Sequence, residues 1–322
     1  MQGICHRRLI PRRAAYFAPD ASMQQIFAQS KNRSQIQQME IIWSPVITGS
    51  RSMLNKLSLG LRTELMMLKP FGGLTPHFDC LQFVSPAMLD YFFGNCLVFP
   101  KPPVADDFPR WTSRFETLFA DMAGIRHQTF LWPSHPFDPS DILPFTEGGF
   151  ELDATFVMAS AHPKAHRPLE AGIALRQVTS DADWQAASDL QISVGLEDME
   201  YEGYSDFERR RMVVLRRWAE AGNGGWFGAF EGSKLVSSLG LYVEKGIARY
   251  QAVGTHKEYR GRGIAGALLA FAAHSIAEQH KVDQFVIIAD QDSTAHRLYL
   301  KSGFEFHAAE HSLMRAPQSE PD

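Results

Sequence analysis

The segment from Val253 to Ala265 constrains the fold of this 322-residue chain more than any other part of it. It reads Val-Gly-Thr-His-Lys-Glu-Tyr-Arg-Gly-Arg-Gly-Ile-Ala, so a strand enters a loop that holds Gly261 and Gly263, and a helix begins at once. Backbone N–H groups at a helix N-terminus bind anionic oxygens, and the missing glycine side chains let a diphosphate come close. The segment predicts a phosphate site, although taken alone it also fits a plain tight turn.

The elements around this loop predict a strand–helix–strand unit within a larger sheet. An amphipathic helix is expected over 263–280, and the apolar run over 285–289 is typical of a strand buried on both faces. The two strands should therefore run parallel, joined by a right-handed crossover. Upstream, alternating apolar residues and turn glycines predict three antiparallel strands over 226–230, 235–243 and 247–255.

Helix signals complete the C-terminal half. Capping residues and apolar stripes predict helices over 181–194 and 205–221, a short helix over 294–301, and a final strand that includes 304–307. The second of these helices holds five arginines flanked by acids. A phosphate-binding face and a solvated face are both open interpretations of it, and the solvated face is the more common.

Two motifs in this order resemble those of the GNAT superfamily of acetyl-CoA-dependent N-acetyltransferases. The first is the acetyl-CoA signature, Arg or Gln, two residues, Gly, one residue, then Gly or Ala, and it is matched by Arg260, Gly263 and Ala265. The second is similar to the run over 292–304. The resemblance covers residues 173–316 and implies a GNAT fold there, an α/β fold with a mixed, mostly antiparallel central sheet and flanking helices.

The resemblance also implies how acetyl-CoA would bind as the co-substrate. The strands that end at Thr255 and Ala289 are expected to splay apart and admit the pantetheine arm, with the N–H of Val253 as oxyanion donor. Backbone amides after the strand would bind the diphosphate. The implied cofactor-binding residues are Val253, Thr255, Arg260, Gly261, Arg262, Gly263, Ile264, Ala265, Gly266 and Asp292. Asp292 stands where the family often has Asn.

Acetyl transfer requires a neutral amine, stabilisation of an oxyanion and a proton for the leaving thiolate. Tyr299 resembles the general acid of the family, and a phenol with a pKa of about 10 suits that role. The alternative is a tyrosine that simply packs on the sheet. For the base, Glu244 at the end of the central strand, an acidic cluster and ordered water all stay open. The cluster, which also suits a cationic amine, comprises Glu197, Asp198, Glu200 and Glu202.

The N-terminal half reads as a smaller α/β domain. An apolar strand over 96–99 ends in prolines, an amphipathic helix is expected over 106–122, and further strands over 127–132 and 150–158 flank a Pro-rich loop. The segment that starts at Gly94, with its prolines and aromatic helix, resembles the N-terminal domain attached to some bacterial GNAT proteins. Because this half has no acetyl-CoA signature, one interpretation is a degenerate GNAT-like half that serves as a substrate platform or dimer surface.

The predicted organisation has five parts. We expect an extension without fixed structure over 1–40, an N-terminal α/β domain over 41–160, a linker over 161–172, the GNAT domain over 173–316 and a tail over 317–322. The extension is rich in arginine near its start, so an organelle-targeting presequence and an upstream start codon are alternatives to a disordered segment.

Composition narrows the classes of function. The chain has 32 Lys and Arg against 36 Asp and Glu, a formal charge of −4, so no global positive field favours nucleic acid. No apolar run reaches the roughly 18 residues of a membrane-spanning helix. Three cysteines without CxxC spacing argue against a zinc site and favour a reducing, cytoplasmic setting. His162 and His166 stand among prolines, so we expect no metal.

These observations predict an N-acetyltransferase that moves an acetyl group from acetyl-CoA to a primary amine of a small molecule or protein. No nucleic-acid or membrane partner is expected, and a homodimer is compatible with the sequence. The alternative function is a non-catalytic acyl-CoA-binding module that regulates a partner.

Overall fold

The computed structural model describes residues 53–54, 56–198 and 203–317. The elements of the N-terminal half are α3 (Leu59–Leu68), β1 (Gly73–Pro76), β2 (Leu81–Val84), β3 (Cys96–Val98), α4 (Asp107–Leu118), β4 (Gln128–Trp132), α5 (Leu143–Glu147) and β5 (Glu151–Ser160). Those of the C-terminal half are β6 (Ile173–Gln177), α6 (Asp181–Gly195), α7 (Tyr204–Trp218), β7 (Gly224–Glu231), β8 (Lys234–Glu244), β9 (Ile247–Thr255), α8 (Ile264–Ala277), β10 (Gln284–Asp290), α9 (Thr294–Lys301) and β11 (Glu305–Arg315). The predicted extension over 1–40 lies outside the described residues.

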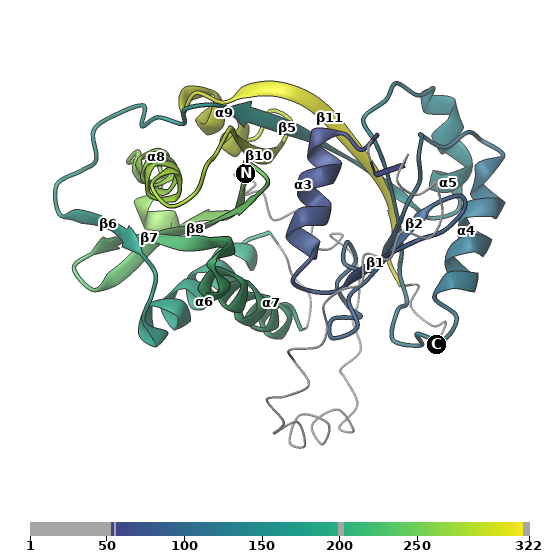
Figure 1. The fold of residues 1–322 in the computed structure, drawn as a ribbon, viewed down its shortest axis with the longest axis horizontal. Coiled ribbons are helices and arrows are strands. Elements are labelled where there is room, and N and C mark those ends of the chain that lie inside the picture. Colours follow the sequence, from purple (N-terminus) through teal and green to yellow (C-terminus); the bar gives the residue numbers. More distant parts are fainter. Residues whose placement is uncertain (1–52, 55, 199–202, 318–322) are drawn as a thin grey trace, which may run out of the picture.

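The helices of the C-terminal half lie close to their predicted positions, because their caps are local. Ser180 accepts a hydrogen bond from the N–H of Asp183 at the start of α6, and Ser293 accepts one from His296 at the start of α9. The expected antiparallel meander is present as β7, β8 and β9, and β10 runs parallel to β9 with a buried centre. Figure 1 shows α8 on one side of this part of the sheet and α6 and α7 on the other.

All the described strands join one eleven-stranded sheet of order β1-β2-β3-β4-β11-β5-β10-β9-β8-β7-β6 (Figure 1). Two parallel pairs, β3 with β4 and β9 with β10, flank the central strands β11 and β5. Each central strand lies beside the parallel pair of the opposite half: β5 pairs antiparallel with β10, and β11 pairs antiparallel with β4. β5 and β11 also pair with each other. The two halves are thus joined by exchanged strands.

The N-terminal half repeats the topology of the C-terminal half. In each, an antiparallel meander leads into a crossover helix, a parallel strand, a short helix and a last strand that crosses to the other half. This α/β arrangement confirms the predicted fold class. The predicted linker over 161–172 is the connection between β5 and β6.

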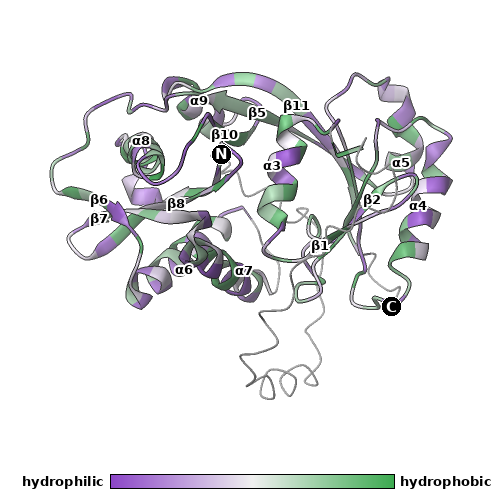
Figure 2. Cartoon of the chain, in the orientation of Figure 1, coloured by the Kyte–Doolittle hydropathy of each residue, from purple (hydrophilic) through white to green (hydrophobic). Residues whose placement is uncertain are grey.

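Several elements were not predicted, and each owes its place to tertiary contacts. The final strand was expected around 304–307, but β11 continues to Arg315 through the buried polar residues Glu310 and Ser312, and the side chain of Glu310 lies against Gly60 of α3. α3 is buried around nearly its whole circumference, so it lacks the apolar stripe by which a helix is recognised. α4 has such a stripe, which includes Trp111, and Figure 2 shows its hydrophilic and hydrophobic stretches alternating.

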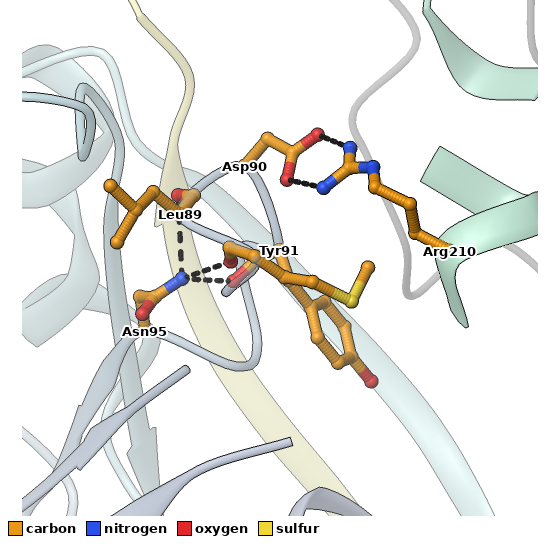
Figure 3. A network of polar contacts seen from close by, with 6 residues as sticks. Leu89, Asp90, Tyr91, Asn95 and Arg210 are labelled. Carbon is orange, nitrogen blue, oxygen red and sulfur yellow. Dashed lines mark hydrogen bonds and ion pairs between the residues drawn. The ribbon is translucent and has the colours of Figure 1, made fainter. Parts of the chain in front are cut away.

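One hydrophobic cluster spans the two halves. A single cluster includes Leu65 and Tyr91 from the N-terminal half with Phe207 and Met212 from α7. At its edge Arg210 of α7 pairs with both carboxylate oxygens of Asp90, and in Figure 3 the two side chains point toward each other.

The loop that carries Asp90 is held by Asn95, which is fully buried. Its side-chain amide donates to the carbonyls of Met88, Leu89 and Tyr91 (Figure 3), and its carbonyl accepts the N–H of Ser85. The joint between the halves thus combines apolar packing with ion pairs, which are partly exposed at Arg210 and Asp90 and buried at Arg249 of β9 and Glu64 of α3. No helix in the part of the chain that the structure describes is long and apolar enough to cross a membrane.

Candidate functional site

β9 and β10 stop pairing with each other before either strand ends. Their register joins only Ile247–Arg249 to Gln284–Val286. β9 then continues to Thr255 and β10 to Asp290 without further pairing between these two strands. The predicted divergence is therefore confirmed, and it opens at the carboxyl ends of parallel strands, where ligands commonly bind.

β9 carries a bulge along this unpaired stretch. On its β8 side, two residues of β9, Ala252 and Val253, face the single residue Leu239. Ala252 has φ of 52°, in the left-handed region that residues other than glycine rarely adopt. The strand thus holds a strained backbone at the residue before the predicted oxyanion donor.

A helix on the neighbouring layer holds this bulge. Gln191 of α6 is fully buried, and its Nε2 donates to the carbonyl oxygen of Ala252 at 2.8 Å and to Oγ of Ser238 at 2.9 Å. Gln191 was not identified from the sequence. The available signal was an amide seven residues after Trp184, on the otherwise apolar face of a predicted helix.

Both glycines of the loop before α8 have a left-handed backbone. Gly261 and Gly263 have φ of 75° and 81°, a region that costs glycine nothing, and Gly263 is the N-cap of α8. The first described bond within this helix runs from Ala267 N–H to the Gly263 carbonyl. The N–H groups of the three preceding residues, Ile264, Ala265 and Gly266, belong to the first turn, where a helix offers no internal acceptor.

Both arginines of the loop engage acids. Arg260 donates from Nε to the Thr255 carbonyl at 2.9 Å and binds Glu197 through both remaining nitrogens at 2.7 and 2.8 Å. Arg262 donates to Glu170 at 2.6 Å, and this hydrogen bond is the main cause that raises the pKa of Arg262. Arg260 thus closes the loop back onto β9. Glu200 and Glu202, the other two glutamates of the predicted acidic cluster, lie outside the described residues.

The connection between β5 and β6 lies against this loop. Arg167 donates from Nη1 to the Gly261 carbonyl at 3.1 Å, and its stem fills the space beside Gly263, where an added Cβ would come within 2.4 Å of Cδ. His166 fills the space beside Gly266 in the same way. Burial lowers the pKa of His166, with help from the charge of Arg167, which favours the neutral imidazole. The sequence analysis treated this segment as a linker and missed Arg167.

The remaining predicted residues of this end of the sheet lie on or before α9. Tyr299 is 1% exposed and packs in the cluster of Leu268 and Ile287, between the helices and the sheet. Asp292 has φ of 57°, and its carbonyl accepts a hydrogen bond from Arg297. Asn and Asp are the residues that best tolerate this left-handed conformation, which accounts for Asp at a position where Asn is common.

Glu244 lies at the far end of β8. It pairs in register with Ile247, the first residue of β9, and forms an ion pair with Lys69 after α3. The eight steps of β9 from there to Thr255 span about 26 Å at about 3.3 Å each. The structure therefore does not bring Glu244 together with the glycine loop.

Two cavities lie away from the loop. One of about 430 Å³ is lined by residues that include Phe115 and Arg126 of the N-terminal half, and one of about 340 Å³ lies beside Ser160 and His307. Among the described residues, no group of three or more His, Cys, Asp or Glu side chains is placed to hold a metal ion.

Comparisons with known proteins place this site within a known family and fold. Residues 193–304 match the model of the acetyltransferase (GNAT) family. A functionally unknown conserved protein from Staphylococcus epidermidis superposes with a TM-score of 0.63 at 12% identity, over 77% of this chain and 95% of that one. A GCN5-related N-acetyltransferase from Kribbella flavida gives 0.58 at 16%, over 85% and 97%. One from Sphaerobacter thermophilus gives 0.54 at 18%, over 80% and 87%. No curated protein matches the chain. At these identities the structural likeness concerns the fold, and it extends across both halves.

Proposed function

Because the C-terminal half of the chain is a GNAT acetyltransferase domain, we propose that the protein transfers an acetyl group from acetyl-CoA to a primary amine of a small molecule or a protein. One observation carries the proposal: β9 and β10 separate directly beside a helix N-terminus that follows two left-handed glycines, where Arg167 and His166 line the space beside Gly263 and Gly266. That combination suits a long, thin ligand with a diphosphate at one end.

The phosphate end of the cofactor fits the start of α8. The first-turn N–H groups of Ile264, Ala265 and Gly266 stand at the positive end of the helix dipole, which favours anionic oxygens. Arg167 adds positive charge beside the same loop, and Arg262 lies there as the partner of Glu170. The pantetheine arm would then follow the unpaired edge of β9, past Thr255 and Val253.

The reacting end of the cofactor would lie at the bulge of β9. As the amine attacks the thioester carbonyl, negative charge develops on the carbonyl oxygen, and the N–H of Val253 would stabilise it. The carbon–sulfur bond then breaks, and the phenol of Tyr299 would supply the proton that the thiolate takes. A phenol and a thiol have similar proton affinities, so this transfer has little thermodynamic cost.

The proton of the incoming ammonium would leave through water. Among the described carboxylates considered as bases, Glu244 is engaged by Lys69 and Glu197 by Arg260.

The test is amine-dependent release of CoA thiol from acetyl-CoA, measured over a panel of primary amines and lysine peptides. Tyr299→Phe should lower kcat by about 10- to 100-fold, the contribution of one general acid, with acetyl-CoA affinity unchanged. Tyr250→Phe is the matched control, because its hydroxyl lies in the same cluster but donates to the Leu269 carbonyl. Acetyl-CoA binding without release toward any amine would instead support the non-catalytic module.

We also infer that the protein works in a reducing, cytoplasmic setting. Cys80 and Cys96 are free and buried, and burial raises the pKa of Cys80 to about 12. Thiols of this kind act as small apolar groups within a core.

A further inference from the structure

Gln191 is a polar side chain in an apolar place. It is fully buried on the face of α6 that also buries Trp184, Ala187 and Val194. Burying an amide costs free energy unless hydrogen bonds compensate, and an apolar residue of the same size would pack this helix as well. The bonds of Gln191 to Ala252 and Ser238 therefore call for a role beyond packing.

The bond to Ala252 sets the direction of the next N–H group. No peptide bond among the described residues is cis, and in a planar trans peptide the C=O and N–H point in opposite directions. The carbonyl of Ala252 points to Gln191, whose amide also contacts Ser238 on β8. The N–H of Val253 therefore points away from Gln191, at a place where β9 does not pair with β10.

The backbone at this point would not keep that direction unaided. The left-handed conformation of Ala252 is unfavourable for a residue with a side chain, and relaxation would rotate the peptide that follows it. The hydrogen bond from Gln191 opposes the rotation. Gly254 leaves room for the amide, because an added Cβ there would come within 3.1 Å of its Nε2.

We propose that Gln191 is a positioning residue, which holds the bulge of β9 so that the N–H of Val253 faces the thioester carbonyl of the acyl donor. The inference rests on the proposed acetyl transfer. Gln191 touches neither the donor nor the amine in this scheme, and it acts only through the peptide between Ala252 and Val253.

The test measures the C=O stretching frequency of the thioester carbonyl. Acetyl-CoA labelled with ¹³C at the thioester carbonyl is bound to the wild-type protein and to Gln191→Met, which keeps the volume of the side chain and removes its donor. In the wild type, the hydrogen bond from Val253 should lower the C=O stretching frequency below that of free acetyl-CoA. Gln191→Met should still bind acetyl-CoA with a Kd within about threefold, lose the frequency shift, and lose about 10- to 100-fold in kcat with any amine that the wild type accepts.

Two further variants separate positioning from packing. Gln185→Met on the same helix removes an exposed amide that donates to Asp189 at 3.0 Å, and it should change neither the frequency nor kcat. Adding Ala252→Gly to Gln191→Met should restore part of the shift, because glycine accepts the left-handed conformation without strain. A merely structural loss would not be rescued by a change in β9.

The outcomes are distinct. A frequency shift and a kcat that survive in Gln191→Met would overturn the positioning role and leave the proposed function standing. A wild-type protein that binds acetyl-CoA without a frequency shift would overturn it as well. Absence of acetyl-CoA binding by the wild type would overturn the proposed function itself.

Discussion

The two halves of the sheet contain the same unit, and only one of the two units is open. In the C-terminal half, β9 and β10 separate and the loop before α8 presents backbone N–H groups. In the N-terminal half, β3 and β4 pair at Leu97 and Val98, and the N–H of Phe99 continues the ladder by donating to the Leu131 carbonyl at 2.8 Å. The parallel pair there stays closed to the end of β3.

The side chains explain why the N-terminal unit stays closed. The rings of Phe99 and Trp111 stack with centroids 3.7 Å apart, and Phe130 packs edge-on against both. The loop before α4 is rich in proline, which has no N–H to offer, and Asp107 at the start of the helix itself accepts the N–H of Val104. In the N-terminal half, the carboxylate of Asp107 thus stands at the helix start where an anion would bind, and aromatic rings pack beside the paired strands. Both features support the interpretation of a degenerate copy.

The largest effect is expected from a variant that disrupts the aromatic packing of the closed half. Trp111→Ala removes a fully buried ring from the aromatic stack and should lower the free energy of unfolding by about 3–5 kcal/mol. Urea unfolding followed by tryptophan fluorescence and circular dichroism measures it. Trp111→Phe keeps most of the stack and should cost less. Equal stability of the two variants would contradict the idea that aromatic packing holds β3 and β4 together.

The second effect is expected from a variant that blocks the glycine loop of the open half. Gly263→Glu places a side chain at φ of 81°, against Arg167, and a negative charge at the phosphate loop. Acetyl-CoA affinity should fall by at least about 100-fold by isothermal titration, while the fold is retained. The control is Asp106→Ala, at the N-cap of the corresponding helix α4, which should leave the affinity unchanged. A similar loss in both variants would mean that the cofactor does not distinguish the halves.

A third effect concerns pH and is expected from a buried histidine of the closed half. Burial lowers the pKa of His127 to about 4, against an ordinary value of 6.5. Between these values the unfolded chain binds the proton more tightly, so stability falls as pH falls, by about 2 kcal/mol between pH 6.5 and roughly pH 5. His127→Gln should lose this part of the pH dependence in urea unfolding. His135→Gln, at an exposed position, should keep it, and an unaltered slope in His127→Gln would contradict the assignment.

The smallest effect is expected from removing an ion pair between the halves, and it tests what couples them. Arg210→Ala removes a partly exposed ion pair across the joint, whereas Arg209→Ala removes one within α7. Exposed pairs contribute at most about 1 kcal/mol, so both variants should be nearly as stable as the wild type, with Arg210→Ala slightly the weaker. Separate unfolding transitions for the two halves in Arg210→Ala would show that the ion pair, and not the exchanged strands, couples them.

Local signals allowed much of the C-terminal half to be predicted. Gly261 and Gly263 mark a left-handed turn on their own, and the apolar run of β10 identifies a strand buried on both faces. The bulge could not be predicted, because alanine does not indicate a positive φ and the conformation of Ala252 depends on a side chain from α6. The length of β11 and the exchange of β5 were also missed, since both are decided by strands distant in sequence. Glu244 was considered as a base because it lies at the end of a strand, but that end of β8 is the one far from the glycine loop.

The exchange of β5 and β11 has a consequence for synthesis. When the ribosome has delivered residues 1–160, β4 still lacks its neighbour β11 and β5 lacks β10, so the first half emerges with open strand edges. Open edges favour aggregation, and long-range pairing slows folding. Neither half therefore reaches its final form until the chain is complete. A gene divided within 161–172 should yield two fragments that become stable only when they are made together.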